Sequence, residues 1–127
     1  MVEGPGPKNP LAFIIEDNES VAEVFKIAIE QADFETEVIH DGQTALDRLA
    51  TMTPALVLLD LHLPFVSGAE ILRHIRTEQH LAQTRVILAT ADLIRAENLE
   101  HQVDIVLTKP FGFTKLYEIA KELRASL

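Results

Sequence analysis

The most apolar stretch of the sequence reads Ala55-Leu56-Val57-Leu58-Leu59, and it ends at Asp60. Five apolar residues in a row leave no polar face for solvent, and a run of this length suits a strand covered by helices on both faces. Pro54 separates the run from the preceding segment. We therefore predict the central strand of a parallel sheet over residues 55–59, with Asp60 at its carboxyl end.

Four further segments read as strands that alternate with amphipathic segments. They span residues 11–15, 35–39, 85–89 and 103–108. Strands that alternate with helices through short connections form parallel sheets with right-handed crossovers. The fold predicted from this alternation is α/β, a doubly wound five-stranded parallel sheet of order 2-1-3-4-5 in a flavodoxin-like three-layer sandwich.

Apolar spacing and capping residues define the expected helices. From Val21 to Ala32 the apolar residues fall on one helical face, and either Asn18 or Ser20 can cap that helix. Asp41 follows the second strand and can cap the second helix.

The later helices differ in the strength of their patterns. Ser67 and Glu70 have the spacing of a capping box for a third helix. A weaker pattern predicts a fourth helix over residues 93–101. A last helix carries the apolar series from Phe113 to Leu127, and Gly112 is a tolerable cap before it.

Length and composition limit the function classes. The 127 residues, 47% of them hydrophobic, predict one globular domain over residues 11–127 behind a flexible Gly- and Pro-rich leader at residues 1–10. No apolar run is long enough for a membrane helix, and the leader does not resemble a secretory signal. The absence of cysteine excludes disulfides and thiolate chemistry and fits a cytoplasmic location. A formal net charge of −9 argues against direct nucleic-acid binding by this domain.

Polar residues end four of the five predicted strands. They are Glu16-Asp17, Asp60, Thr90 and Lys109. Ligands of open α/β sheets bind outside the carboxyl ends of the strands, so these residues should crowd one crevice. Three carboxylates in one place need protons or a cation, and oxygen ligands suit Mg²⁺. A carboxylate such as Asp60 can then accept a phosphoryl group.

At these positions the sequence resembles the receiver domains of response regulators in two-component signalling, a CheY-like family. The shared features are the acidic pair Glu16-Asp17, Asp60 within Leu-Leu-Asp-Leu-His-Leu-Pro, Gly68, Thr90-Ala91 and Lys109-Pro110-Phe111. The resemblance extends from Leu11 to Leu127, and its specificity lies in the order of the motifs rather than in any one of them.

The resemblance implies a role for each of these residues. Asp60 would be the phosphoacceptor, and Mg²⁺ would be held by Glu16, Asp17, Asp60 and the backbone carbonyl of His62. Thr90 would bond to the phosphoryl group and Lys109 would pair with it. The family also implies a cis bond before Pro110, a sensor histidine kinase or phosphotransfer protein as donor, an unknown downstream protein or output domain, and a signalling switch rather than a turnover enzyme.

Simpler interpretations stand beside these roles. Glu16 and Asp17 can instead cap the first helix, since acids favour helix N-termini. For His62 we favour an exposed loop side chain that contributes only its carbonyl. Asp92 lies where the family adjusts the access of water to the phosphoryl group, and the sequence does not decide whether it positions or repels that water.

Two departures from the family raise an alternative function. Val106 stands where many receivers carry a Tyr or Phe that rotates inward with the threonine. The segment between Thr90 and Lys109 is short, which predicts a trimmed or displaced fourth helix. The alternative is therefore an interaction module that works without phosphorylation or with an atypical readout. An FMN-binding electron carrier and a phosphate-ester hydrolase are less favoured, because the sequence has neither a phosphate loop after Ile15 nor a second acid–base motif.

The sequence leaves the context of the domain open. It ends soon after the last predicted helix, so we expect a domain that acts through contacts alone or one taken from a longer protein. It does not decide whether the domain forms a homodimer.

Overall fold

Five parallel strands form one sheet in the computed structural model, which describes residues 9–127. The strands are β1 (Leu11–Ile15), β2 (Glu35–Ile39), β3 (Leu56–Asp60), β4 (Arg85–Thr90) and β5 (Ile105–Thr108). Their order in the sheet is β2-β1-β3-β4-β5. The predicted fold class and strand order are thus confirmed. Residues 1–8 of the predicted leader lie outside the described residues.

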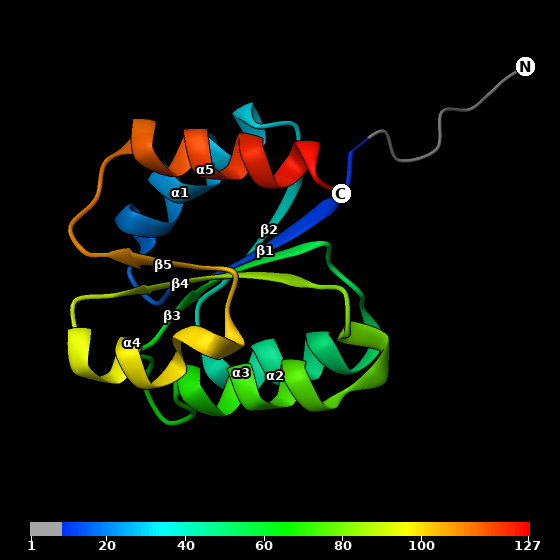
Figure 1. The fold of residues 1–127 in the computed structure, drawn as a ribbon. Helices are drawn as coiled ribbons and strands as arrows, with labels where there is room; N and C mark the ends of the chain where they lie inside the picture. The colour runs from blue at the N-terminus through cyan, green and yellow to red at the C-terminus, as the bar shows by residue number, and fades with distance from the viewer. Residues whose placement is uncertain (1–8) are drawn as a thin grey trace, which may run out of the picture.

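Five α-helices cover the two faces of the sheet. They are α1 (Glu19–Gln31), α2 (Gly42–Thr51), α3 (Gly68–Thr77), α4 (Leu93–Leu99) and α5 (Phe113–Ala125). Helices α1 and α5 lie on one face, and α2, α3 and α4 lie on the other (Figure 1). Short 3-10 helices at Gln79–Leu81 and Glu100–Gln102 precede β4 and β5. None of the helices in residues 9–127 combines the length and the apolar character that crossing a bilayer requires.

The continuous apolar runs build two cores at once. In β1, Ala12 and Ile14 pack under α1 and α5, whereas Phe13 and Ile15 pack on the opposite face with α2 and α3. Successive side chains of a strand point to opposite faces, so a strand covered on both sides must be apolar throughout. The same logic explains the four buried apolar residues Leu56–Leu59 of β3, which are followed by the buried carboxylate of Asp60.

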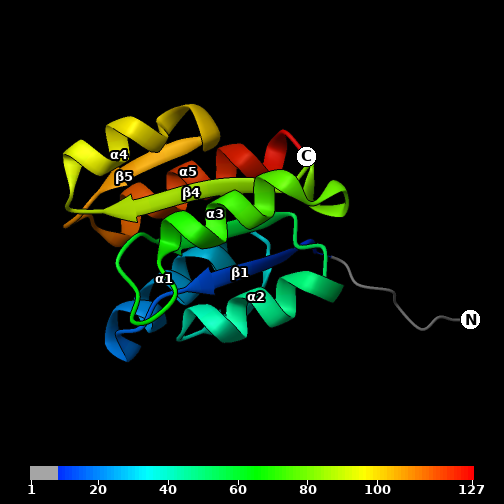
Figure 2. The same cartoon turned by 90° about the horizontal axis from the view of Figure 1, so that it is seen from below.

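Side-chain caps fix where the helices begin. Asn18 accepts a hydrogen bond from the amide of Val21 over 2.9 Å, and Asp41 accepts one from the amide of Thr44 over 2.8 Å. Ser67 accepts one from the amide of Glu70 over 3.2 Å. Of the two caps that the sequence left open, Asn18 is the one used. Because β1, β2 and β3 are parallel, as the arrows of β1 and β4 also show for their side of the sheet (Figure 2), the loops that precede these helices gather at one edge.

Three expected boundaries were wrong by two residues, while β3 runs one residue later than predicted and β4 ends one residue later. The last helix ends at Ala125, so Leu127 lies beyond it and is half exposed. The fifth strand begins at Ile105 rather than Val103. The fourth helix stops at Leu99 and continues only as a 3-10 turn.

Candidate functional site at the carboxyl edge of the sheet

The register of the parallel strands brings Glu16 beside Asp60. Ile15 at the end of β1 pairs with Leu59 on one side and with Ile39 on the other. Glu16 extends this ladder by one residue, since its amide donates to the carbonyl of Ile39 over 3.0 Å. Asp60 is the last residue of β3, so the two carboxylates leave neighbouring strands at the same edge.

Thr90 and Lys109 complete the edge from the other side of β3. Asp60 pairs with Ala89, which places Thr90 at the adjacent end of β4. The amide of Lys109 donates to the carbonyl of Thr90 over 2.9 Å. The peptide bond between Lys109 and Pro110 is cis, as the family resemblance implied. All of the predicted strand-end residues therefore meet at one edge of the sheet.

Three carboxylates converge closely enough to share an ion. One oxygen from each of Glu16, Asp17 and Asp60 lies within 4.8 Å of the others, and in residues 9–127 this is the only such cluster of acids and histidines. Glu16 and Asp60 are only 3% and 5% exposed, whereas Asp17 is exposed. An all-oxygen donor set that is open to solvent on one side fits a hard cation such as Mg²⁺, which keeps several waters.

Lys109 supplies positive charge to this cluster. Its Nζ lies 2.8 Å from Oε1 of Glu16 and 3.5 Å from Oδ2 of Asp60. Burial raises the pKa of Glu16, and the nearby charge of Asp60 adds to this rise, which the hydrogen bond from Lys109 only partly offsets. Burial by itself lowers the pKa of Lys109, but the bond to Glu16 and the charge of Asp60 outweigh it and raise that pKa. The cluster thus brings three carboxylates together with one lysine, so negative charge exceeds positive charge there.

The loop after Asp60 is built around a close backbone approach. The amide of His62 donates to Oδ1 of Asp60 over 3.1 Å, and the amide of Gly68 donates to the carbonyl of Leu61 over 2.9 Å. A Cβ atom on Gly68 would lie only 2.5 Å from the carbonyl oxygen of Asp60. Glycine is therefore required eight residues after Asp60 for steric reasons, because the chain returns against the strand end.

Thr90 and Asp92 form the next part of the rim. Thr90 is 1% exposed, and its hydroxyl oxygen accepts a hydrogen bond from the amide of Asp92 over 2.9 Å. Oδ2 of Asp92 lies 3.7 Å from Nε2 of His62, whose side chain is 56% exposed. His62 is thus the exposed loop side chain that we favoured, and its imidazole faces Asp92 rather than the acidic cluster.

Helix capping does not explain the acidic pair. Asn18 caps α1, so neither Glu16 nor Asp17 is needed for this purpose. The amide of Asn18 instead donates to Oε2 of Glu16 over 3.3 Å. The capping interpretation of Glu16 and Asp17 is wrong, and both carboxylates are left to the site.

The segment between Thr90 and Lys109 has an unusual anchor. Arg76 of α3 donates to the carbonyls of Gln102 and Thr84 over 2.7 and 3.0 Å. It also lies 3.4 Å from Oδ2 of Asp104, which accepts the amide of Val86 over 2.7 Å. This network could not be predicted from the sequence, because nothing in the spacing pairs an arginine with an aspartate 28 residues away.

A second contact that the sequence analysis missed involves His40. Nδ1 of His40, directly after β2, lies 3.0 Å from the backbone oxygen of Glu16. The only signal in the sequence was the position of a polar residue at the end of a strand adjacent to β1.

Fold and site together define a doubly wound α/β domain with an acidic cleft at the carboxyl edge of its sheet. Residues 12–121 match the response regulator receiver domain family, and the chain belongs to that family. Receiver domains are signalling switches of two-component systems rather than turnover enzymes. The resemblance inferred from the motifs is therefore confirmed.

Individual relatives agree with this assignment. The uncharacterized transcriptional regulatory protein YkoG of Bacillus subtilis is 37% identical over 118 residues, which cover 91% of this chain and 50% of YkoG. The signal receiver domain of a putative LuxO repressor protein from Vibrio parahaemolyticus superposes with a TM-score of 0.83 at 26% identity, covering 93% of this chain and 92% of that one.

A third comparison concerns a receiver with a metal ion. The receiver domain of sensor histidine kinase PA1611 from Pseudomonas aeruginosa PAO1, with magnesium coordinated in its active-site cleft, gives a TM-score of 0.81. It is 21% identical and covers 92% of this chain and 98% of that one, so the likeness concerns the fold. The chain spans about half the length of the curated relatives that it matches.

Proposed function

We propose that this domain accepts a phosphoryl group on Asp60 from a sensor histidine kinase or a phosphotransfer protein. The supporting observation is the cluster of Glu16, Asp17 and Asp60 with Lys109 beside it. Mg²⁺ would be held by these three carboxylates and by the backbone carbonyl of His62. Bound Mg²⁺ supplies positive charge that offsets the negative charge of the phosphoryl oxygens.

The transfer needs only one nucleophile. A carboxylate oxygen of Asp60 forms a bond to phosphorus while the bond from phosphorus to the donor's imidazole nitrogen breaks, and that nitrogen keeps the electron pair. Lys109 lies 3.5 Å from Asp60 and is placed to offset charge on the transferred group. Water later attacks phosphorus, which releases inorganic phosphate and restores the carboxylate. Positioning and charge carry most of the rate effect in such transfers.

Thr90 would report that the phosphoryl group has arrived. Its hydroxyl oxygen accepts the amide of Asp92, which leaves the hydroxyl proton to be donated to a phosphoryl oxygen. If the side chain of Thr90 turned toward Asp60, its hydrogen bond with the amide of Asp92 would break, and the start of α4 would be released. This step links the chemistry to a change in the surface near α4.

The domain itself would act in the cytoplasm without binding nucleic acid. Its net charge of −9 opposes contact with a phosphate backbone. Curated relatives include proteins named as DNA-binding regulators, but the match covers about half of each of them. A downstream protein or output domain would therefore receive the signal.

Intact-mass measurement after incubation with acetyl phosphate and Mg²⁺ tests the proposal. We expect the wild type to gain one phosphoryl group and Asp60→Asn to gain none. A wild type that stays unmodified under conditions that label a control receiver would refute the proposed function.

A second candidate, an interaction module with an atypical or absent response to phosphorylation, is favoured by Val106. This side chain is partly buried in β5 and packs with the α2–α3 core, and it has no ring that could swing inward. The Arg76 network also holds the end of the fourth helical segment to α3. Comparing partner binding with and without beryllofluoride separates the two, because equal affinity in both states means that no switch operates.

A further inference from the structure

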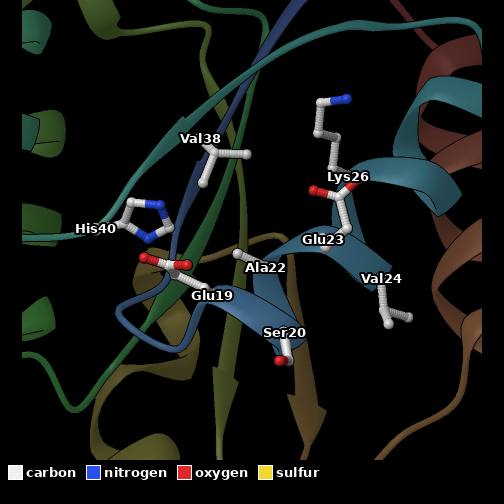
Figure 3. A pocket seen from close by; sticks show the side chains of 8 residues that line it. All are labelled: Glu19, Ser20, Ala22, Glu23, Val24, Lys26, Val38 and His40. Carbon is white, nitrogen blue, oxygen red and sulfur yellow. The ribbon is translucent and has the colours of Figure 1, made fainter.

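His40 is held against the backbone of the acidic pair. It follows β2 directly, and its Nδ1 lies 3.0 Å from the carbonyl oxygen of Glu16. A carbonyl can only accept, so Nδ1 must carry the proton and donate it. His40 and Glu19 both line the hollow between β2 and α1 (Figure 3).

We propose that His40 is a positioning residue for the divalent cation, because it fixes the peptide that carries Asp17. This inference rests on the proposed function, since it assumes that Asp17 binds Mg²⁺. The role differs from that of the ligands themselves, because the polar contact of His40 is to the backbone oxygen of Glu16 and not to a carboxylate of the cluster. Partners that orient metal ligands from outside the coordination sphere strengthen metal affinity in this way.

Asp17 depends on its backbone for its orientation, because its own side chain is not held by polar contacts. It is exposed, and within residues 9–127 its carboxylate takes part in no hydrogen bond or ion pair shown by the structure. Its position is therefore set by the backbone on either side. Asn18 anchors the following residue as the cap of α1, and Glu16 anchors the preceding one.

The anchor at Glu16 consists of two bonds to β2. The amide of Glu16 donates to the carbonyl of Ile39, and its carbonyl accepts from His40. Two bonds at opposite ends of one residue fix the orientation of the peptide planes that lead to Asp17. With the first bond alone, the plane between Glu16 and Asp17 can tilt, and the carboxylate would lose its fixed direction. A binding site whose residues are displaced by a small distance from the productive geometry loses much of its affinity.

The test compares three variants in the full chain. His40→Ala removes the donor, and His40→Asn returns an N–H to the place of Nδ1. His80→Ala is the matched control, because His80 is also exposed and contacts a backbone carbonyl, that of Leu49 over 2.8 Å, in a contact that involves none of the acidic residues. Mg²⁺ affinity is measured by an amide NMR titration, and the same spectra show whether each variant is folded.

We expect His40→Ala to weaken Mg²⁺ binding about threefold to tenfold, which is the scale of one net hydrogen bond. His40→Asn should stay within about twofold of the wild type, and His80→Ala should leave the affinity unchanged. A role that is merely structural would lower stability in His40→Ala and His80→Ala alike without changing Mg²⁺ affinity in either.

Three results would overturn the inference. If the wild type binds Mg²⁺ and His40→Ala binds it equally well, the inference fails while the proposed function stands. Nitrogen NMR of the imidazole in the metal-free wild type gives an independent check, because an unprotonated Nδ1 on His40 contradicts the donated bond. A wild type that binds no Mg²⁺ would overturn the proposed function and this inference together.

Discussion

Nζ of Lys109 lies 2.8 Å from Oε1 of Glu16, closer than the 3.5 Å that separates it from Oδ2 of Asp60. The lysine is therefore first the counter-ion of Glu16. A cation bound by the acidic residues would compete with it for that carboxylate. Lys109 would then be free to turn toward a phosphoryl group on Asp60, and the ion pair would link metal binding to the availability of the lysine.

Replacing Lys109 tests its role as a counter-ion. Lys109→Met leaves the buried carboxylates of Glu16 and Asp60 without a cation. We expect the metal-free free energy of unfolding to fall by about 1–3 kcal/mol, less than for a fully buried pair because Lys109 is 26% exposed. Urea unfolding with and without Mg²⁺ checks this, and Mg²⁺ should recover part of the loss. Unchanged metal-free stability would contradict the role.

Replacing Asp17, the exposed carboxylate, distinguishes the repulsion among the three carboxylates from their binding of Mg²⁺. Asp17→Asn should leave the metal-free protein as stable as the wild type or more so, because one of three crowded charges is gone. The same change should weaken Mg²⁺ binding by at least about tenfold and so remove the rise in melting temperature that Mg²⁺ produces. Thermal unfolding over a range of Mg²⁺ concentrations measures both effects. An undiminished Mg²⁺ effect in this variant would exclude Asp17 as a ligand.

Gly68 tests the steric basis of the loop beside Asp60. A Cβ atom there would meet the backbone of Asp60 and Leu61 at 2.5 and 2.6 Å, which only a shift of the chain can relieve. Gly68→Ala should cost about 1–3 kcal/mol of stability and displace the loop. Gly112→Ala is the control, because nothing lies within 4 Å of its Cβ position. Equal effects of the two changes in urea unfolding would show that the close approach is unimportant.

Acid pH should reveal the ion pair between Glu37 and Arg48. The hydrogen bond from Arg48 lowers the pKa of Glu37 below its ordinary value, outweighing the opposite effect of burial. A carboxyl whose pKa is lower in the folded state stabilises the protein above its unfolded pKa of about 4.3, and this contribution is lost as the pH falls through the folded pKa. Glu37→Gln should therefore be slightly destabilised near neutral pH and match the wild type in acid.

The effect should be small, because the two side chains are 31% and 40% exposed. Glu35→Gln on the same strand is the control, since Glu35 is exposed. Chemical unfolding across the pH range measures the difference. If the difference in the free energy of unfolding between Glu37→Gln and the wild type persisted in strong acid, the pKa shift of Glu37 would not be its cause.

The sequence was most informative where its pattern is forced by the fold. Residues 56–59 are buried on both faces of the sheet and must be apolar, so the central strand could be predicted within one residue. The acidic residues at the strand ends could also be found, because parallel strands place their carboxyl ends at one edge of the sheet. Capping residues such as Asp41 and Ser67 were found because their hydrogen bonds are local.

Long-range polar contacts could not be predicted in this way. The predicted strand begins at Val103, but the side chain of Asp104 accepts a hydrogen bond from the amide of Val86, and regular strand begins only at Ile105. The bond from His40 to Glu16 likewise joins residues 24 positions apart. Such contacts depend on how loops meet after the sheet has formed, and a single sequence carries little trace of them.

Phosphorylation at Asp60 itself is the central claim, and locating the label tests it most directly. The wild type is incubated with acetyl phosphate in the presence of either Mg²⁺ or a chelator, and peptide mass spectrometry identifies the modified residue. We expect a single phosphoryl group on Asp60 that appears with Mg²⁺ and is suppressed by the chelator. A label on another residue such as His62, or labelling of Asp60 that does not depend on the metal, would contradict it.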